Sequence, residues 1–155
     1  MLVKDAMTRR PETIGPGEPL TAAARAMRAA GVGALPVCEG ERLVGMITAR
    51  DIVVRSVAAG EDPRTALVRG AMTPQVLSCV EDEELERAAT LMDEHAVRRM
   101  PVVDAFGALV GIVSVDDLAL FSRALAGEVI EHSREPGRPV ERGGYPWWEE
   151  PDDAR

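Results

Sequence analysis

Val3-Lys-Asp-Ala-Met-Thr8, near the start of the chain, returns as Val68-Arg-Gly-Ala-Met-Thr73. The similarity continues beyond each copy, since Pro36-Val37 matches Pro101-Val102 at the same offset of 65 residues. A repeat of this length indicates one supersecondary unit used twice. Because backbone-restricted prolines match as well as apolar residues, we expect both copies to share one backbone. Two such units commonly pack about a pseudo-two-fold axis, and a ligand cleft forms where they meet.

Length, charge and cysteine content limit the classes of function. The 155 residues suit one compact domain or two close subdomains. No charged-then-apolar leader or membrane-length apolar run is found, which predicts a soluble, cytoplasmic protein without a membrane partner. The net charge of −8 opposes attraction to phosphate backbones, so we do not expect nucleic acid as a partner. Cys38, Cys79, His95 and His132 have no zinc-ligand spacing, so we expect no metal.

Each repeat is predicted to hold a lead-in, a helix, two strands and a second helix. After one inserted residue the match resumes at an offset of 66, where Leu43-Val44-Gly45 corresponds to Leu109-Val110-Gly111. Helical spacing of apolar residues and short β-branched runs predict the following elements. They are helices at 20–30, 49–59 and 84–94, strands at 34–38, 43–48, 100–103 and 109–114, and a last helix from Asp116 to the region of His132.

The expected fold class is α+β, with tandem β-α-β-β-α repeats at residues 1–60 and 66–125. We predict that Gly31 ends the first helix in a left-handed cap, and that Leu118, Phe121 and Leu125 share one face of the last helix. Residues 126–155 are expected to hold the end of this helix and an acidic, Pro/Gly-rich, flexible tail.

The second strand of each repeat ends in a hydroxyl residue followed three positions later by an acid. These tetrapeptides are Thr48-Ala-Arg-Asp51 and Ser114-Val-Asp-Asp117. The pattern is close to a capping box, which stabilises a helix start by about 1 kcal/mol. A hydroxyl and a carboxylate at a strand-to-helix junction can also bind a ligand, because the carboxylate accepts hydrogen bonds from both ribose hydroxyls. Both interpretations stay open: an isolated match favours the cap, and the repetition inside matched repeats narrows that preference.

With these motifs the chain resembles the cystathionine β-synthase-type (CBS) domain pair, or Bateman module, especially its stand-alone bacterial members. The resemblance covers about residues 1–125 and rests on three linked motifs in each repeat. They are Ala6-Met-Thr8 and Ala71-Met-Thr73, Gly31-Val-Gly-Ala-Leu-Pro36-Val and Ala96-Val-Arg-Arg-Met-Pro101-Val, and Leu43-Val-Gly-Met-Ile-Thr48-Ala-Arg-Asp51 and Leu109-Val-Gly-Ile-Val-Ser114-Val-Asp-Asp117.

The resemblance implies non-catalytic binding of an adenosyl ligand (AMP, ADP, ATP or S-adenosylmethionine) in clefts between the repeats. The implied ribose contacts are Asp51 and Asp117, with Thr48 and Ser114 near the sugar or phosphate. The implied adenine and wall contacts are Thr13, Ile14, Ala34, Leu35, Pro36, Ser78, Cys79, Met100 and Pro101. Arg50, Arg98 and Arg99 are candidate phosphate contacts, although exposed arginines are also ordinary surface residues.

The clefts should differ, because Arg50 stands before the first acid and Asp116 before the second. We therefore expect AMP, ADP or ATP to prefer the first cleft, and the second cleft to be weaker, empty, or better suited to a less anionic adenosyl ligand. The module would act as a sensor or regulator, with the nucleotide as a regulatory ligand and no required cofactor. The sequence contains no phosphate loop, nucleophile elbow or metal motif, so we do not expect an enzyme.

The alternative function is a structural or interaction module whose clefts have lost their ligand. Tyr145, Trp147 and Trp148 in the tail would then suit a regulated protein partner, although a solvated tail also fits the composition. We further expect a homodimer, because the resemblance implies one and because residues 20–30 and 85–92 carry small and apolar side chains in duplicate.

Overall fold

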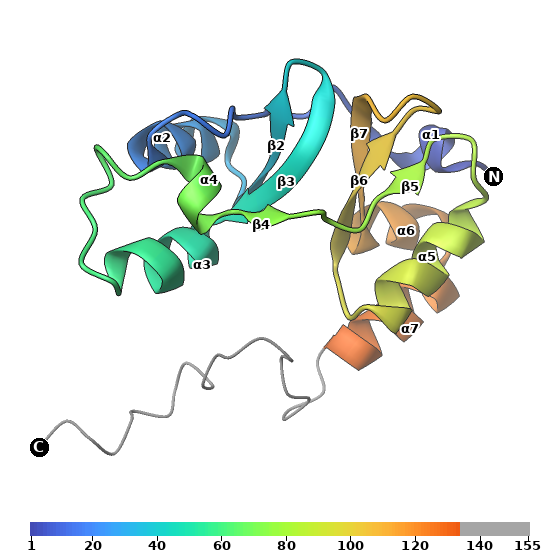
Figure 1. Cartoon of the computed structure of the whole chain (residues 1–155). Coiled ribbons are helices and arrows are strands. Elements are labelled where there is room, and N and C mark those ends of the chain that lie inside the picture. Colours follow the sequence, from blue (N-terminus) through green and yellow to red (C-terminus); the bar gives the residue numbers. More distant parts are fainter. Residues whose placement is uncertain (134–155) are drawn as a thin grey trace, which may run out of the picture.

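The computed structural model describes residues 1–133, which form two lobes of helices and short strands (Figure 1). In chain order the elements are α1 (Val3–Ala6), β1 (Thr8–Arg9), α2 (Leu20–Ala30), β2 (Ala34–Glu39), β3 (Arg42–Thr48), α3 (Ala49–Asp51), the π-helix η1 (Ile52–Val57), α4 (Val68–Ala71), β4 (Thr73–Pro74), β5 (Cys79–Val80), α5 (Leu85–Glu94), β6 (Arg99–Val103), β7 (Leu109–Ser114), α6 (Val115–Phe121) and α7 (Arg123–Ser133).

Two sheets, one in each lobe, carry the repeated topology. The first lobe has strand order β2-β3-β4, and the second has β1-β7-β6-β5. β5 runs parallel to β6, and at the corresponding place Ile14 forms a parallel bridge with Val37 of β2. In each repeat an antiparallel hairpin and a helix follow. The predicted α+β fold with two β-α-β-β-α repeats is therefore confirmed.

The lead-in of each repeat completes the lobe of the other repeat. β1 pairs with β7, whereas β4 pairs with β3. Figure 1 shows the blue N-terminal helix α1 beside the second lobe's elements. Val3 is fully buried in the core of this second lobe, and Val68 is fully buried in the core of the first. The ranges 1–60 and 66–125 thus follow the order of the chain, while each spatial unit contains a segment from both.

The repeated glycines of β3 and β7 allow these lead-ins to approach closely. A Cβ atom on Gly45 would lie 2.7 Å from the backbone oxygen of Thr73, and one on Gly111 would lie 2.9 Å from that of Thr8. Such distances are too short for any side chain at either position. The two glycines match along the sequence because each faces the lead-in of the other repeat, and the two lead-ins are equivalent.

The helices that follow the lead-ins form as the sequence predicts. α2 buries Leu20, Ala23 and Met27, which recur at helical spacing, and Gly31 ends it with a φ of 66° in the left-handed region. α5 buries one face in the same way in the second lobe. These helices attach to cores made by the exchanged lead-ins, the central strands and the helices after the hairpins.

The helices after the hairpins differ from the prediction. Residues 52–57 form a π-helix, whose wider turns apolar periodicity does not reveal. The second helix is not continuous, because the chain is extended at Ser122, between α6 and α7. The Ser122 hydroxyl accepts a hydrogen bond from the backbone N–H of Leu125 at 3.3 Å, which caps α7. The prediction of one shared face is wrong, because Leu118 is fully buried whereas Phe121 is exposed.

The end of the described chain lies in the second lobe. α7 buries Ala126 and Val129 in that core. The predictions about the tail, including Tyr145, Trp147 and Trp148, fall outside the described residues. Within residues 1–133, no helix combines the length and the apolar character that a membrane crossing requires.

Candidate functional site

The first strand-to-helix junction forms the capping box that its sequence predicts. β3 ends at Thr48, whose Oγ1 accepts from the backbone N–H of Asp51 at 3.0 Å. In return, Oδ2 of Asp51 accepts from the backbone N–H of Thr48 at 2.9 Å. The Asp51 side chain is 15% exposed, and Nη2 of Arg55 lies 3.7 Å from its Oδ1. Both carboxylate oxygens of Asp51 therefore have a partner.

The second junction repeats the box with one difference. Oδ2 of Asp117 accepts from the backbone N–H and from the hydroxyl of Ser114, both at 2.7 Å, while the Asp117 N–H donates to the Ser114 hydroxyl at 3.3 Å. Within residues 1–133, Oδ1 of Asp117 has no hydrogen-bond or ion-pair partner. Capping accounts for both motifs locally, and the second box leaves a carboxylate oxygen available.

Strand pairing brings several predicted contacts to these junctions. In the first lobe Ala34 pairs with Thr48, and the N–H of Ile14 donates to the backbone oxygen of Pro36 at 3.1 Å. In the second lobe Arg99 pairs with Ser114. Residues directly opposite on antiparallel strands point to the same face of the sheet, so Arg99 and Ser114 share a face. At the equivalent position opposite Thr48, the first lobe has the uncharged Ala34.

The remaining predicted contacts differ in exposure. Leu35 and Met100 are fully buried in the two cores, and Pro36 and Pro101 are also buried. The Cys79 thiol is buried and donates to the backbone oxygen of Pro101 at 3.9 Å, and burial raises its pKa to about 12. Thr13, Arg50, Arg98 and Asp116 are exposed, and Ser78 is partly buried. The predicted difference in charge between Arg50 and Asp116 therefore lies at the surface.

Two cavities lie where the exchanged lead-ins leave the sheets. One of about 400 Å³ is lined by Arg42, Leu43, Val44, Gln75, Val76, Ser78, Val103 and Gly107. The other, of about 330 Å³, is lined by Arg9, Arg10, Leu109 and Val110. The first is within the range of small-molecule sites. Leu43-Val44 and Leu109-Val110 are equivalent in the repeats, so the cavities occupy related positions.

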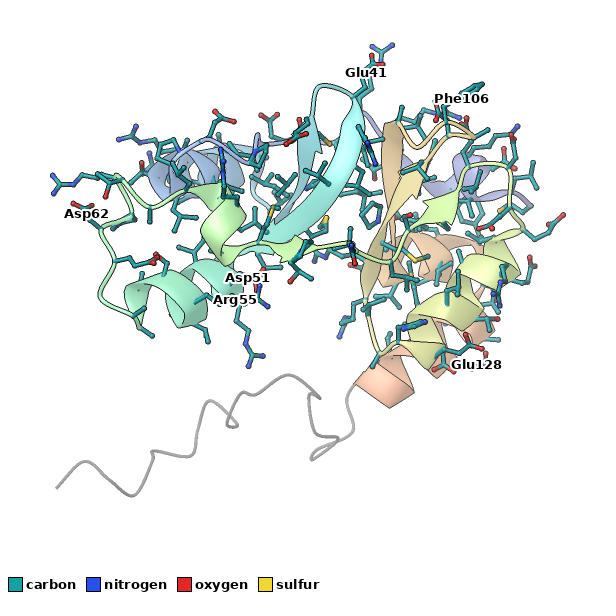
Figure 2. The ribbon with its side chains drawn as sticks, in the orientation of Figure 1. Glu41, Asp51, Arg55, Asp62, Phe106 and Glu128 are labelled. Atoms are coloured by element: carbon teal, nitrogen blue, oxygen red, sulfur yellow. The ribbon has the colours of Figure 1, made fainter. Side chains whose placement is uncertain are left out.

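Most cavity residues were not among the predicted contacts, which contribute only Ser78. Arg10 and Gln75 are equivalent in the repeats, and both have a positive φ, 50° and 49°. Such values are uncommon for residues other than glycine, and the sequence gives no sign of them. Figure 2 shows Glu41 and Phe106 together at the end where the hairpins turn, while Asp51 and Arg55 lie at the opposite end. The cavity of about 400 Å³ is lined by Arg42, which follows Glu41, so this cavity reaches toward the end where the hairpins turn.

No group of three or more His, Cys, Asp and Glu side chains in the described part of the chain could hold a metal ion. Chemically, the two junctions offer carboxylate and hydroxyl oxygens, with arginine cations beside them. This set suits recognition of a polyhydroxylated, anionic small molecule.

Comparison with known proteins assigns the repeats. The CBS domain model matches residues 3–57 and 68–123. The CBS domain-containing protein YhcV of Bacillus subtilis is 42% identical over 118 residues, covering 76% of this chain and 83% of YhcV. A crystal structure of Hypoxic Response Protein I with two coordinated zinc ions has a TM-score of 0.73 and 38% identity, covering 79% of this chain and 99% of that protein.

Two further structures contain adenosyl ligands. The CBS domain pair of protein MJ0100, in complex with 5′-methylthioadenosine and S-adenosyl-L-methionine, is 30% identical with a TM-score of 0.69, over 79% of this chain and all of that one. CBSX2 in complex with AMP is 29% identical with a TM-score of 0.68, over 77% of this chain and 94% of that one. With both repeats matched by the family model and the fold shared with solved pairs, the chain belongs to the CBS domain family.

Proposed function

We propose that this protein is a non-catalytic regulatory module that binds an adenosyl ligand (AMP, ADP, ATP or S-adenosylmethionine) between its repeats. The observation that carries the proposal is the repeated junction carboxylate, with Oδ1 of Asp117 free to accept hydrogen bonds. The complexes of MJ0100 and CBSX2 support the ligand class. The ligand would serve as a regulatory signal, and no cofactor is required.

We name two clefts by their junctions. The first cleft contains Thr48, Arg50 and Asp51, and the second contains Ser114 and Asp117. A carboxylate can accept from the two hydroxyls of a ribose, while a guanidinium group suits a phosphate. The other predicted contacts, Thr13, Ile14, Ala34, Leu35, Pro36, Ser78, Cys79, Arg98, Arg99, Met100 and Pro101, complete this proposal.

Charge separates the two clefts. Arg50 and Arg55 stand at the first, whereas Arg99 faces the second together with the exposed Asp116. Because Arg99 lies opposite Ser114, the difference in charge between the two clefts is smaller than Arg50 and Asp116 alone would give. The first cleft still has the more positive surroundings and should prefer AMP. The second has the free carboxylate oxygen and should accept a less anionic ligand such as 5′-methylthioadenosine.

Calorimetric titration of the full chain with AMP, ADP, ATP, S-adenosylmethionine and 5′-methylthioadenosine tests this function. At least one should bind with a dissociation constant below about 1 mM, which corresponds to a binding free energy near −4 kcal/mol. If none of the five binds at that level, the clefts are not adenosyl sites.

The alternative is an interaction module with degenerate clefts, and exposed apolar side chains favour it. Val53, Val54 and Val57 of η1 are each more than half exposed, and Leu120 of α6 is 81% exposed. Val54 and Leu120 are equivalent in the repeats, so both lobes present an apolar side chain on the helix after the hairpin. Binding of a protein partner without any adenosyl effect would support this alternative.

These helices also refine the proposed homodimer. The large apolar side chains of α2 and α5 face their own cores. Exposed large apolar side chains lie instead on η1 and α6, at Val53, Val54, Val57, Leu120 and Phe121. A second copy covering these side chains would give about twice the 16.7 kDa chain mass in light scattering. A monomer at every concentration would contradict this assembly. A regulated partner bound through the tail, and a cytoplasmic location where adenine nucleotides are used, complete the proposal.

A further inference from the structure

The guanidinium group of Arg55 joins two segments that lie far apart in the sequence. Its Nη1 donates to the backbone oxygens of Ala71 and Met72 at 3.0 and 3.1 Å, and to Oγ1 of Thr73 at 3.2 Å. Its Nη2 lies 3.7 Å from Oδ1 of Asp51. Arg55 therefore connects the carboxylate of the first cleft with the lead-in of the second repeat, and Figure 2 shows it beside Asp51.

The acceptors on the lead-in are available for a structural reason. α4 has only four residues, and the last carbonyl groups of any helix have no partner within it. A cation near a helix C-terminus is also electrostatically favourable. Arg55 satisfies the backbone oxygens of Ala71 and Met72, so it helps to hold the lead-in where β4 joins β3.

The second lobe lacks this connection. Phe121 occupies the equivalent position, is 45% exposed, and has no hydrogen-bond donor on its side chain. Asp117 accordingly keeps Oδ1 free, whereas Oδ1 of Asp51 faces a cation. The two clefts therefore differ in how the ribose acceptor is held as well as in charge.

We propose that Arg55 is a positioning residue that couples ligand binding at Asp51 to the attachment of the second repeat's lead-in, residues 71–73. The inference rests on the proposed function of the first cleft. A ribose that donates to Oδ1 of Asp51 competes with the 3.7 Å ion pair and changes the partners left for the guanidinium group. Because coupling is reciprocal, the state of the lead-in also changes the affinity of the cleft.

The same geometry makes Arg55 a determinant of ligand charge. Its cation opposes a neutral nucleoside by occupying Asp51, and it favours a phosphorylated one by attraction. Replacing it should therefore lower the ratio of AMP affinity to adenosine affinity by about three- to tenfold, after solvent and salt screening. A purely structural role would change both affinities by the same factor.

Hydrogen exchange and calorimetry on Arg55→Met and Arg55→Lys test the coupling. Without ligand, Arg55→Met should speed amide exchange in residues 68–73 about threefold or more, since the hydrogen bonds from Arg55 to residues 71–73 are lost. AMP should alter exchange in this segment of the wild-type protein and should not alter it in Arg55→Met. Arg55→Lys keeps the charge and can replace part of the contacts, so it should be intermediate and serves if Arg55→Met fails to fold. Arg25→Met removes an equal charge from the exposed face of α2 and should match the wild-type protein.

The outcomes separate this inference from the function on which it rests. If AMP binds and Arg55→Met retains both the AMP effect on exchange and the wild-type affinity ratio, the coupling is wrong and the proposed function stands. If AMP and adenosine bind neither protein, the proposed function fails and the coupling fails with it. If amide exchange in residues 68–73 is unchanged in ligand-free Arg55→Met, Arg55 does not hold the lead-in, and this result alone would overturn the inference.

Discussion

The two strand-to-helix junctions share a capping box, yet the helices that leave them differ. After Asp51 the chain enters a π-helix that carries Arg55, and Ser56 within it is fully buried with its hydroxyl unpartnered among the described residues. After Asp117 a regular helix ends at Phe121, and the equivalent Ser122 caps α7. The repeat thus preserves the carboxylate and its cap, while its surroundings have diverged.

The largest expected effect comes from substituting the glycines that contact the exchanged lead-ins, Gly45 and Gly111. Gly45→Ala would place a Cβ atom 2.7 Å from the backbone oxygen of Thr73. Gly111→Ala would meet the flexible Met7 Sδ at 2.5 Å and a backbone oxygen at 2.9 Å. We expect Gly45→Ala to lower the free energy of unfolding by about 2–3 kcal/mol and Gly111→Ala by about 1–2 kcal/mol, because the added Cβ atom lies closer to the backbone oxygen at Gly45 than at Gly111.

Urea unfolding followed by far-UV circular dichroism measures both changes. The matched control is Gly127→Ala in α7, where no atom lies within 4 Å of the added Cβ, and where alanine should stabilise by about 0.5–1 kcal/mol. If Gly45→Ala unfolds at the wild-type urea concentration, the lead-in does not lie against β3 as described.

The sequence predicts the fold well because the repeat aligns residues with the same structural task. Pro36 and Pro101, Gly45 and Gly111, and the alternation of helices and strands all reflect one backbone used twice. The exchange of lead-ins could not be predicted, because a repeat shows which segments are equivalent and not which lobe each one completes. The break at Ser122 was missed because apolar spacing continues through it, although a serine is a common helix cap.

The local geometry of the candidate site was predictable at its two junctions and less so around them. Thr48, Asp51, Ser114 and Asp117 form their boxes because the motif is local. Arg55 carried no signal in the sequence, since its acceptors lie 16 to 18 residues away on the next repeat's lead-in. The motifs of the sequence also did not mark the arginines of the cavities, Arg9, Arg10 and Arg42.

A smaller effect distinguishes the ligands of the two clefts. Asp51→Ala should weaken AMP binding about tenfold, and Asp117→Ala should weaken 5′-methylthioadenosine binding by a similar factor, which corresponds to about 1.4 kcal/mol in each case. Each variant is titrated with both ligands after circular dichroism shows that it folds, because either change also removes part of a helix cap. Equal loss of AMP affinity in the two variants would mean that the clefts are equivalent for this ligand.

Reversing one surface charge should make the clefts more alike. Asp116→Arg gives the second cleft the cation that Arg50 provides in the first, so AMP affinity there should rise about two- to fivefold at low salt and less at high salt. Glu86→Arg makes the same change in net charge on the exposed side of α5 and should leave AMP binding unchanged. If both variants bind AMP more tightly by the same factor, net charge rather than position is responsible.

The last comparison is between Cys79 and Ile14, which holds the same position in the first repeat. Burial raises the pKa of the Cys79 thiol from 9.0 to about 12, so at pH 8 its labelling by a thiol reagent should be on the order of a thousandfold slower in the folded than in the unfolded protein. Because the folded pKa is the higher one, this thiol's contribution to stability is complete below pH 9 and is lost as the pH rises toward about 12. Cys79→Val should remove that part of the pH dependence, which is measured as the difference between the urea midpoints of the two proteins at each pH. Labelling of folded Cys79 at the unfolded rate would show that the second lobe opens locally around β5.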